Sequence, residues 1–449
     1  MNETICALAT APGGALGIIR VSGTEAFAAV SSICSVHCDC CAANTIHLAR
    51  ILDGSELIDE VLVSVFRAPH SYTGEDAVEI SCHGSIYILN RVLEMLLEHG
   101  CRMAKPGEYT MRAYLNGKMD LSQAEAVADL VASSNKASHL AAISQLKGQF
   151  SNELVLLRNE LLKLTSLLEL ELDFSDHEDL EFADRSELLE LAEITDARIR
   201  ELAGTFKQGQ AIKHGIPVAI VGKTNVGKST LLNKLVGDDR AIISSIHGTT
   251  RDTIEDEIEI DGVKFRFIDT AGIRETTDEI ERIGIERTMR AIEKARIVIW
   301  LFDTLPARSE ILKMAELTKG KHELDVLNKC DLYDMEHFVP NMVPMTCISA
   351  KHGTGINTLK RKIFEEAKND GLIGQESDII ITNTRHYDSL IRAHESTQQV
   401  IDSLEQNLST DLIAENLRQA INVLAEITGS QITPQETLDN IFSNFCVGK

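Results

Sequence analysis

The densest set of residues with chemical potential is the stretch GKTNVGKS at residues 222–229, which matches the pattern GxxxxGK[ST]. An apolar, strand-like run, IPVAIV, precedes it, and a helix-like run follows. Glycines let successive backbone N–H groups turn toward one point, and the start of a helix adds positive potential there. The pattern predicts a phosphate-binding loop of a nucleotide site, with Lys228 on the β- and γ-phosphates and Ser229 on Mg²⁺.

Three shorter motifs follow, each after another strand-like run: DTAG at 269–272, NKCD at 328–331 and SAK at 349–351. Asp269 is placed to support the Mg²⁺ shell, and Gly272 lets its amide approach the γ-phosphate. Asp331 can accept hydrogen bonds from guanine N1–H and from the exocyclic amine, contacts that adenine cannot supply. The four motifs in this order predict that the nucleotide is GTP.

A candidate switch segment, SSIHGTTRDT at 244–253, lies between the phosphate loop and DTAG, and Thr250 is its predicted Mg²⁺ ligand. Ras-like enzymes carry a water-positioning glutamine directly after this DxxG motif, but this chain has Ile273, which cannot orient water. Catalytic help must therefore come from another group, and an arginine or equivalent cation is worth about 10³–10⁵ in rate. The alternatives left open are Arg251, Arg274, Glu281 and a bound monovalent cation.

A parallel α/β sheet is the framework that these motifs require. From Ile216 onward, strand-like runs alternate with helix-like runs, the pattern of a Ras-like P-loop domain over 215–368. The predicted GTP-contacting residues are Asn225, Val226, Gly227, Lys228, Ser229, Thr230, Ser244, Ser245, Ile246, His247, Gly248, Thr249, Thr250, Asp269, Thr270, Ala271, Gly272, Asn328, Lys329, Asp331, Ser349, Ala350 and Lys351.

The flanking sequence predicts a multidomain α/β and α protein. Residues 1–118 indicate an α+β domain, with strands in GALGIIRVSG (14–23) and IDEVLVSVFRAP (58–69) and a helix in SIYILNRVLEMLLEHG (85–100). Residues 119–210 and 369–449 are helix-like, which predicts one helical domain interrupted by the α/β domain. Leucines recur at helical spacing in the first part, at Leu154, Leu157, Leu161, Leu164 and Leu168.

Cysteines supply two further candidate sites. Cys446, in FCVGK at 445–449, fits a prenyl anchor, a reactive thiol or a tail packed into a ligand site. Gly448, Lys449 and the lack of upstream basic residues disfavour prenylation, whereas a nucleophilic and a structural role both stay open. The run CSVHCDCC at 34–41 offers five soft or borderline metal ligands, four cysteines and one histidine. Without a second CxxC pair, an exposed loop of reduced cysteines is favoured over zinc.

Bulk composition limits the classes of partner. The 449 residues include 44 Lys and Arg against 68 Asp and Glu, a formal charge of −24, which argues against nonspecific coating of a nucleic acid. Neither an apolar run long enough to span a membrane nor a signal peptide is present. Ten cysteines without a secretion signal favour a reducing compartment. We therefore expect a cytoplasmic protein with no membrane and no DNA partner.

Motifs along nearly the whole chain resemble the MnmE (TrmE) family of tRNA-modification GTPases. Inside the α/β domain these are the phosphate loop with Asn225 and the stretches GTTRD, DTAGIRE and EIERIGIER. Outside it they are ATAPGGALGIIRVSG, SYTGEDAVEISCHG, KPGEYTMRAYLNGKMDLSQAEAVADLV and FCVGK. The chain departs from the family pattern at Lys223-Thr224, where Arg-Pro is frequent, and at Ser244 and His247.

This resemblance implies a homodimer whose residues 1–118 form a folate-binding and dimerisation domain. It implies GTP hydrolysis that depends on K⁺ and is triggered by dimerisation of the GTPase domains. It also implies an FAD-containing partner, MnmG (GidA), in a heterotetramer. Together they would add an aminomethyl-type group, such as carboxymethylaminomethyl, to C5 of the wobble uridine (position 34) of certain tRNAs. The one-carbon donor would be 5-formyl- or 5,10-methylene-tetrahydrofolate.

The resemblance also assigns roles to residues. The K⁺ ligands would be Asn225, Ser244, Ile246 and Thr249, those of the switch segment largely through backbone oxygens. Glu281 would orient the attacking water, and Cys446 would lie near the transferred carbon. The folate contacts would be Arg20, Glu79, Lys118 and Lys449.

Two alternatives remain. One is a ribosome-assembly or signalling GTPase that acts only as a switch, and the other is a folate sensor that regulates a partner without modifying tRNA. The first would favour a basic RNA-binding appendage, whereas this sequence has acidic helices.

Overall fold

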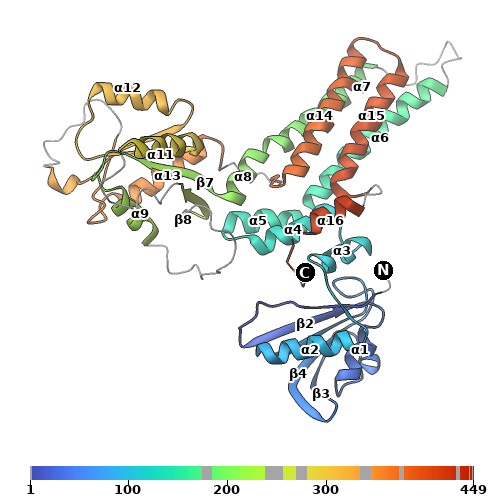
Figure 1. Ribbon diagram of the computed structural model, residues 1–449. Helices are drawn as coiled ribbons and strands as arrows, with labels where there is room; N and C mark the ends of the chain where they lie inside the picture. The colour runs from blue at the N-terminus through green and yellow to red at the C-terminus, as the bar shows by residue number, and fades with distance from the viewer. Residues whose placement is uncertain are drawn as a thin grey trace. The chain divides into compact units, whose positions relative to one another are not determined.

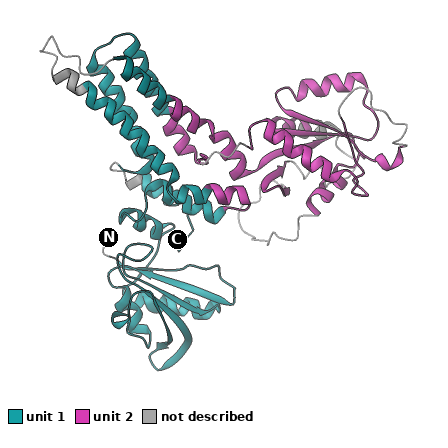
Figure 2. Ribbon diagram, turned by 180° about the vertical axis from the view of Figure 1, so that it is seen from behind, with its two compact units in different colours: residues 1–132, 142–196, 392–449 teal, residues 133–141, 197–391 magenta. Residues whose placement is uncertain are grey.

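The computed structural model describes residues 3–173, 185–237, 256–268, 281–333, 345–373, 379–430, 435–443, 445–446 and 448 (Figure 1). The chain forms two compact units (Figure 2). Unit 1 comprises residues 1–132, 142–196 and 392–449, and unit 2 comprises residues 133–141 and 197–391. None of the helices in the described part is both long enough and apolar enough to cross a membrane.

Unit 1 begins with a six-stranded, mostly antiparallel sheet in the order β3-β4-β5-β2-β1-β6. The strands are β1 (Ile5–Leu8), β2 (Leu16–Ser22), β3 (Thr45–Asp53), β4 (Glu56–Phe66), β5 (Ala77–His83) and β6 (Arg102–Met103). Helices α1 (Ala26–Ile33) and α2 (Ile86–Glu98) pack on one face of the sheet, where alternate residues such as Ile19, Val63 and Ile80 are fully buried. The opposite face carries Arg20, Glu79 and exposed apolar residues, because strand side chains alternate.

The predicted strands at 14–23 and 58–69 and the helix at 85–100 are confirmed as β2, β4 and α2. The expectation of an exposed cysteine loop at 34–41 is wrong for two of its four cysteines, Cys34 and Cys38. Cys34 and Cys38 are buried in the core beneath the sheet, which raises the pKa of the Cys38 thiol to about 11, while Cys40 is exposed. Within the described residues, no three His, Cys, Asp or Glu side chains are grouped to hold a metal ion.

The helices of unit 1 follow the sheet. They are α3 (Glu108–Leu115), α4 (Leu121–Ala132), α6 (Gln149–Asp173), α15 (Thr410–Thr428) and α16 (Gln435–Ser443), with parts of α5 (Lys136–Leu146), α7 (Arg185–Gly204) and α14 (Thr384–Glu405). Helix α6 packs along α15 (Figure 1). The five leucines at helical spacing are each at most 2% exposed, which confirms that they form the packed face of α6.

Unit 2 contains a six-stranded sheet in the order β12-β11-β10-β7-β9-β8, parallel except for the hairpin of β8 and β9. The strands are β7 (Ile216–Val221), β8 (Asp256–Ile260), β9 (Val263–Phe267), β10 (Ile297–Phe302), β11 (His322–Leu327) and β12 (Thr346–Cys347). The helices are α8 (Phe206–His214), α9 (Lys228–Gly237), α11 (Glu281–Lys294), α12 (Arg308–Leu317) and α13 (Ile356–Asn369). Both faces of the sheet are buried, as a doubly covered parallel sheet requires.

One partly buried acid in this sheet predicts a pH-dependent stability. Burial, with the negative charge of Glu323 beside it, raises the pKa of Asp325 from 3.8 to about 6, and Asp325 Oδ1 has no hydrogen-bond partner within the described residues. The folded chain therefore holds this proton more tightly than the unfolded chain does. The stability that the protonated form contributes is complete below about pH 4 and is lost as the pH rises through about 6.

We expect Asp325→Asn to stabilise unit 2 by about 1–2 kcal/mol at pH 8, a figure reduced for partial solvent screening, and to have no effect near pH 4. Urea unfolding followed by Trp300 fluorescence measures this, because Trp300 is the only tryptophan of the chain and is the register partner of Asp325. Glu316→Gln, on the exposed side of α12, is the matched control. A stabilisation that is equal at both pH values would contradict the prediction.

Candidate nucleotide site and N-terminal site

The phosphate loop joins β7 to α9 and has the backbone conformation that its sequence predicts. Gly222, Asn225 and Gly227 have φ angles of +155°, +63° and +97°. A Cβ on Gly222 would lie 2.1 Å from Leu301 O, so a larger residue does not fit beside β10. Lys228 Nζ donates to the carbonyl oxygens of Gly222 (2.8 Å) and Lys223 (2.7 Å), and burial lowers the pKa of this ammonium. The lysine therefore lies over the loop, where phosphate oxygens are expected.

Asn328 connects three loops at the carboxyl ends of the strands. Its Nδ2 donates to Val226 O of the phosphate loop at 2.7 Å, and its Oδ1 accepts from Ala350 N at 3.0 Å. The side chain is 3% exposed, and a Cβ on Gly227 would lie 2.3 Å from its Nδ2. Asn328 is thus an internal brace that fixes the phosphate loop against the loop after β12, a role that sequence reasoning missed.

Asp331 is held for recognition of a base. Ser349 Oγ donates to Asp331 Oδ1 at 2.6 Å, and this bond lowers the pKa of the carboxyl, so it is ionised at neutral pH. Its exposed carboxylate can accept two hydrogen bonds, which matches the N1–H and amine donors of guanine. Nearby, Lys329 has φ +61° and pairs with Asp303 Oδ2 at 2.7 Å. Asp303 was not predicted, although its position directly after β10 could have indicated it.

The remaining predicted nucleotide residues divide between described and undescribed positions. Thr230 is exposed in the first turn of α9, Ser229 is half-buried beside it, and Lys351 is exposed after β12. Glu281 begins α11, but its side chain lies outside the described residues. So do the following positions: Ser244, Ser245, Ile246, His247, Gly248, Thr249, Thr250, Arg251, Asp269, Thr270, Ala271, Gly272 and Arg274.

A second cluster in unit 1, the N-terminal site, consists of Arg20, Tyr72, Glu79, Tyr109 and Gly448. Arg20 Nε donates to Glu79 Oε1 at 2.8 Å, and Arg20 Nη1 donates to Gly448 O at 3.0 Å. The guanidinium carbon lies 5.7 Å from the ring centre of Tyr72 and 5.6 Å from that of Tyr109. The predicted residues Arg20 and Glu79 therefore meet, and the chain's tail reaches them. The two tyrosines were not predicted, because no motif spacing relates them to Arg20.

The tail follows a defined path to this site. Gly107 N–H donates to Cys446 O at 3.3 Å, and a Cβ on Gly107 would lie 2.7 Å from Phe442 O. The Cys446 side chain is exposed. Lys118 Nζ donates to Pro69 O at 2.8 Å, so it lies on the loop that leads to Tyr72. Lys449 lies outside the described residues.

The parallel sheet, the GxxxxGK[ST] loop and the ionised Asp331 beside the SAK loop together define unit 2 as a GTPase of the P-loop class. Residues 121–446 match the family model for the MnmE helical domain, and residues 4–118 match the model for the GTP-binding protein TrmE N-terminus. The chain therefore belongs to the MnmE (TrmE) family.

Curated relatives agree over their full lengths. The tRNA modification GTPase MnmE of Bacteroides thetaiotaomicron is 49% identical over 467 residues, covering 100% of both chains. That of Flavobacterium johnsoniae is also 49% identical over 467 residues, covering 100% of this chain and 99% of the relative. Among solved structures, the FeoB G-domain of Methanococcus jannaschii is 29% identical over 34% of this chain and 96% of that chain, with a TM-score of 0.25.

Proposed function

We propose that this chain is a GTP hydrolase that acts in the modification of tRNA. The observation that carries this proposal is the 49% identity, over the whole chain, to proteins named tRNA modification GTPase. The braced phosphate loop and the ionised Asp331 support the GTP-dependent part. In this proposal GTP is hydrolysed in unit 2, with Glu281 orienting the attacking water and Arg274 as a further candidate for charge stabilisation.

In its full form, the proposal includes an FAD-containing MnmG (GidA) partner in a heterotetramer. The two proteins add an aminomethyl-type group to C5 of the wobble uridine of certain tRNAs, with a tetrahydrofolate as one-carbon donor and ammonium or glycine as nitrogen donor. The N-terminal site supports the folate part, because Arg20 and Glu79 offer a fixed cation and carboxylate beside the exposed ring of Tyr72. Such a set suits a flat heterocycle that carries N–H donors and a carboxylate. Lys118, Lys449 and Cys446 complete the proposed contacts.

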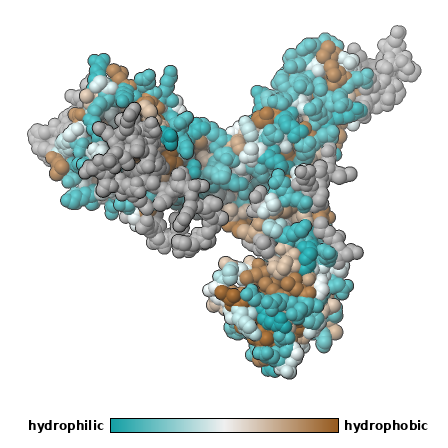
Figure 3. All heavy atoms as spheres, in the orientation of Figure 1, coloured by the Kyte–Doolittle hydropathy of each residue, from teal (hydrophilic) through white to brown (hydrophobic). Residues whose placement is uncertain are grey.

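A homodimer is proposed through the sheet of unit 1. Its open face exposes Ile46, Leu48 and Leu62, with exposed fractions of 66%, 74% and 47%. Leu48 and Leu62 are direct cross-strand partners, so they form one apolar surface rather than scattered side chains. Figure 3 shows hydrophobic side chains at the surface of the domain that contains this sheet. Covering that surface with a second copy would remove apolar area from water.

The metal ions of the proposal are assigned to hydroxyl and amide side chains and, in the switch segment, largely to backbone oxygens. Mg²⁺ would be held by Ser229 and Thr250, and K⁺ by Asn225, Ser244, Ile246 and Thr249. The exposed amide of Asn225, at a loop position with φ +63°, fits a cation ligand next to the phosphates. A bound K⁺ would supply positive charge where other GTPases use an arginine.

Reconstitution tests the proposed function. The full chain would be combined with the MnmG-type partner, GTP, K⁺, 5,10-methylene-tetrahydrofolate, unmodified tRNA and, in parallel reactions, ammonium or glycine as the nitrogen donor. Modified wobble uridine, measured by nucleoside mass spectrometry, is the expected product. GTP hydrolysis without any tRNA change would favour the alternative, a GTPase that acts only as a switch.

The potassium assignment predicts that GTP hydrolysis is at least 10-fold faster in K⁺ than in Na⁺ at equal ionic strength. The reason is that a cation of the wrong size does not fit the same set of oxygens beside the phosphates, so stabilisation of the developing charge is lost. Phosphate release measures the rate, with choline chloride as the control salt. Equal rates in K⁺ and Na⁺ would remove K⁺ from the proposal.

A further inference from the structure

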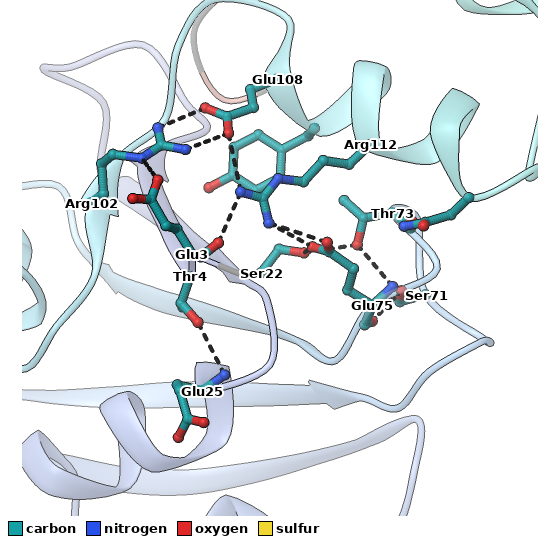
Figure 4. Close-up of polar contacts among 12 residues, drawn as sticks. Glu3, Thr4, Ser22, Glu25, Ser71, Thr73, Glu75, Arg102, Glu108 and Arg112 are labelled. Atoms are coloured by element: carbon teal, nitrogen blue, oxygen red, sulfur yellow. Dashed lines mark hydrogen bonds and ion pairs between the residues drawn. The ribbon is translucent and has the colours of Figure 1, made fainter. Parts of the chain in front are cut away.

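A buried ionic network lies beside the N-terminal site, and no sequence motif predicted it (Figure 4). Its centre is Arg112 on α3, which is 1% exposed. Arg112 Nη1 donates to both carboxylate oxygens of Glu75, at 3.1 and 3.0 Å, and Nη2 donates to Glu3 O (2.9 Å) and Glu108 Oε1 (3.1 Å). Arg112 Nε has no hydrogen-bond partner within the described residues.

The positive charge of Arg112 faces two carboxylates, Glu75 and Glu108. Burial alone would raise the pKa of Glu108, but bonds from Arg102, the Lys105 N–H and Arg112 lower it to about 2. Glu108 therefore stays ionised and gives Arg112 a negative partner besides Glu75. It shares this charge with Arg102 (2.7 Å), which has Glu3 as a second carboxylate partner. A buried ion pair that leaves a donor unpaired is a poor device for stability alone, because apolar residues of similar volume would serve as well. The second carboxylate, Glu75, thus calls for another explanation, which its further contacts supply.

Glu75 ties the loop that carries Tyr72 to the strand that carries Arg20. Ser22 Oγ, on β2, donates to Glu75 Oε2 at 2.9 Å and shares a hydrogen bond with Thr73 Oγ1 at 2.7 Å. Ser22 is two residues from Arg20, so both side chains lie on the same face of the sheet. The loop is consequently fixed to β2, through Thr73 and Glu75, two residues away from Arg20.

Helix α3 and its C-cap residue, Asn116, hold the loop at two other points. Asn116 Nδ2 donates to Thr73 O at 2.7 Å, and the hydroxyl of Tyr72 pairs with Thr110 Oγ1 at 2.8 Å. Helix α3, the loop and β2 therefore form one hydrogen-bonded block, and the Tyr72 ring beside Arg20 is its only exposed aromatic surface among the residues named here.

We propose that the Arg112–Glu75 pair is the positioning element of the N-terminal site. It holds the Tyr72 ring beside the Arg20 guanidinium, so that the site is preformed for a flat, carboxylate-bearing heterocycle such as a reduced folate. Neither Arg112 nor Glu75 touches the ligand. The proposal rests on the folate assignment made above only for the identity of that ligand.

Glu75→Gln is the sharpest test, because it preserves the shape of the side chain and leaves two carboxylates, Glu3 and Glu108, for the guanidiniums of Arg102 and Arg112. Glu3→Gln is the matched control: it makes the same chemical change in the same network, but the Glu3 side chain is 71% exposed, pairs with Arg102 and does not touch the loop. With the full chain, we expect Glu75→Gln to weaken binding of 5-formyl-tetrahydrofolate about 10-fold by calorimetry. Glu3→Gln should change it less than twofold.

A double-mutant cycle separates positioning from general stability. Tyr72→Ala removes the ring that the pair is proposed to hold, so Glu75→Gln should add less than a twofold further loss of affinity in that background. If the loss of affinity in the double variant equalled the product of the two single losses, the proposal would be overturned. An unchanged affinity in Glu75→Gln would also overturn it. Hydrogen exchange gives a readout without ligand: amides of residues 71–76 should exchange at least 10-fold faster in Glu75→Gln and not in Glu3→Gln.

The exchange measurement also separates this proposal from the folate assignment. If the unsubstituted chain does not bind 5-formyl-tetrahydrofolate, the folate assignment is wrong, and exchange in the loop alone decides the positioning role. Exchange that is equal in all three proteins would overturn it.

Discussion

Replacing Asn328 with alanine is expected to lower the affinity for both GTP and GDP about 100-fold. The substitution removes the brace between the phosphate loop and the loop after β12, and it leaves Val226 O and Ala350 N without their partner in a buried place. Unsatisfied buried groups cost about 1–3 kcal/mol each, and a 100-fold change corresponds to about 2.7 kcal/mol. Titration with a fluorescent guanine nucleotide measures the affinity.

Asn357→Ala is the matched control for this substitution, since Asn357 is exposed on α13. It should leave the affinity unchanged within a factor of two. Trp300 fluorescence would show whether unit 2 of Asn328→Ala is folded. If the folded variant kept its affinity for GTP and GDP, the contact between Asn328 and the phosphate loop would be unimportant for binding.

Asp331→Asn is expected to lower GTP affinity by about 100- to 1,000-fold and to raise the affinity for xanthosine triphosphate. A carboxylate accepts both donors of guanine, whereas an amide at the same place puts its NH₂ group against one of them. Xanthine has a carbonyl oxygen where guanine has the amine, and this oxygen accepts from the new amide. Competition between the two nucleotides, in the substituted and unsubstituted chains, gives the change in preference.

Ser349→Ala provides the graded comparison. Ser349 Oγ orients Asp331 and lowers its pKa, but it does not replace the carboxylate, so the expected loss of GTP affinity is only about 10-fold with no change of base preference. If Asp331→Asn left the preference for guanine intact, the assignment of Asp331 to base recognition would be wrong.

Much of unit 2 could be predicted because its chemistry is local. The phosphate loop lies between β7 and α9, and Asn328 and Ser349 follow strands, as the motifs indicate. A motif reports backbone conformation over a few residues, so Gly222 and Gly227 could be placed from sequence. The brace could not, because Asn328 meets a carbonyl 102 residues away and the pairing depends on the order of the strands.

The N-terminal site shows the same limit more strongly. Arg20 and Glu79 were predicted from the resemblance to the MnmE family, and the register of β2 with β5 makes them neighbours. Their roles toward a ligand stay predictions. The ionic partners of Arg112 could not be predicted, because no motif relates it to Glu75, which lies 37 positions away in the chain. The burial of Cys38 was missed for a related reason: it depends on α1 and on the sheet together, not on local composition.

The hydrogen bond from Arg20 to Gly448 spans 428 positions of the chain. Ribosomes add about 5–20 residues per second, so the second partner of this bond is synthesised about 20–90 s after the first. During that interval the sheet of unit 1 can already be folded, yet its arginine lacks the tail. A nascent polypeptide released early, by a premature stop codon or by ribosome stalling, would thus have a well-formed amino-terminal domain with an incomplete ligand site. Synthesis as far as Gly448 is therefore needed before the hydrogen bonding of Arg20 in this site is complete.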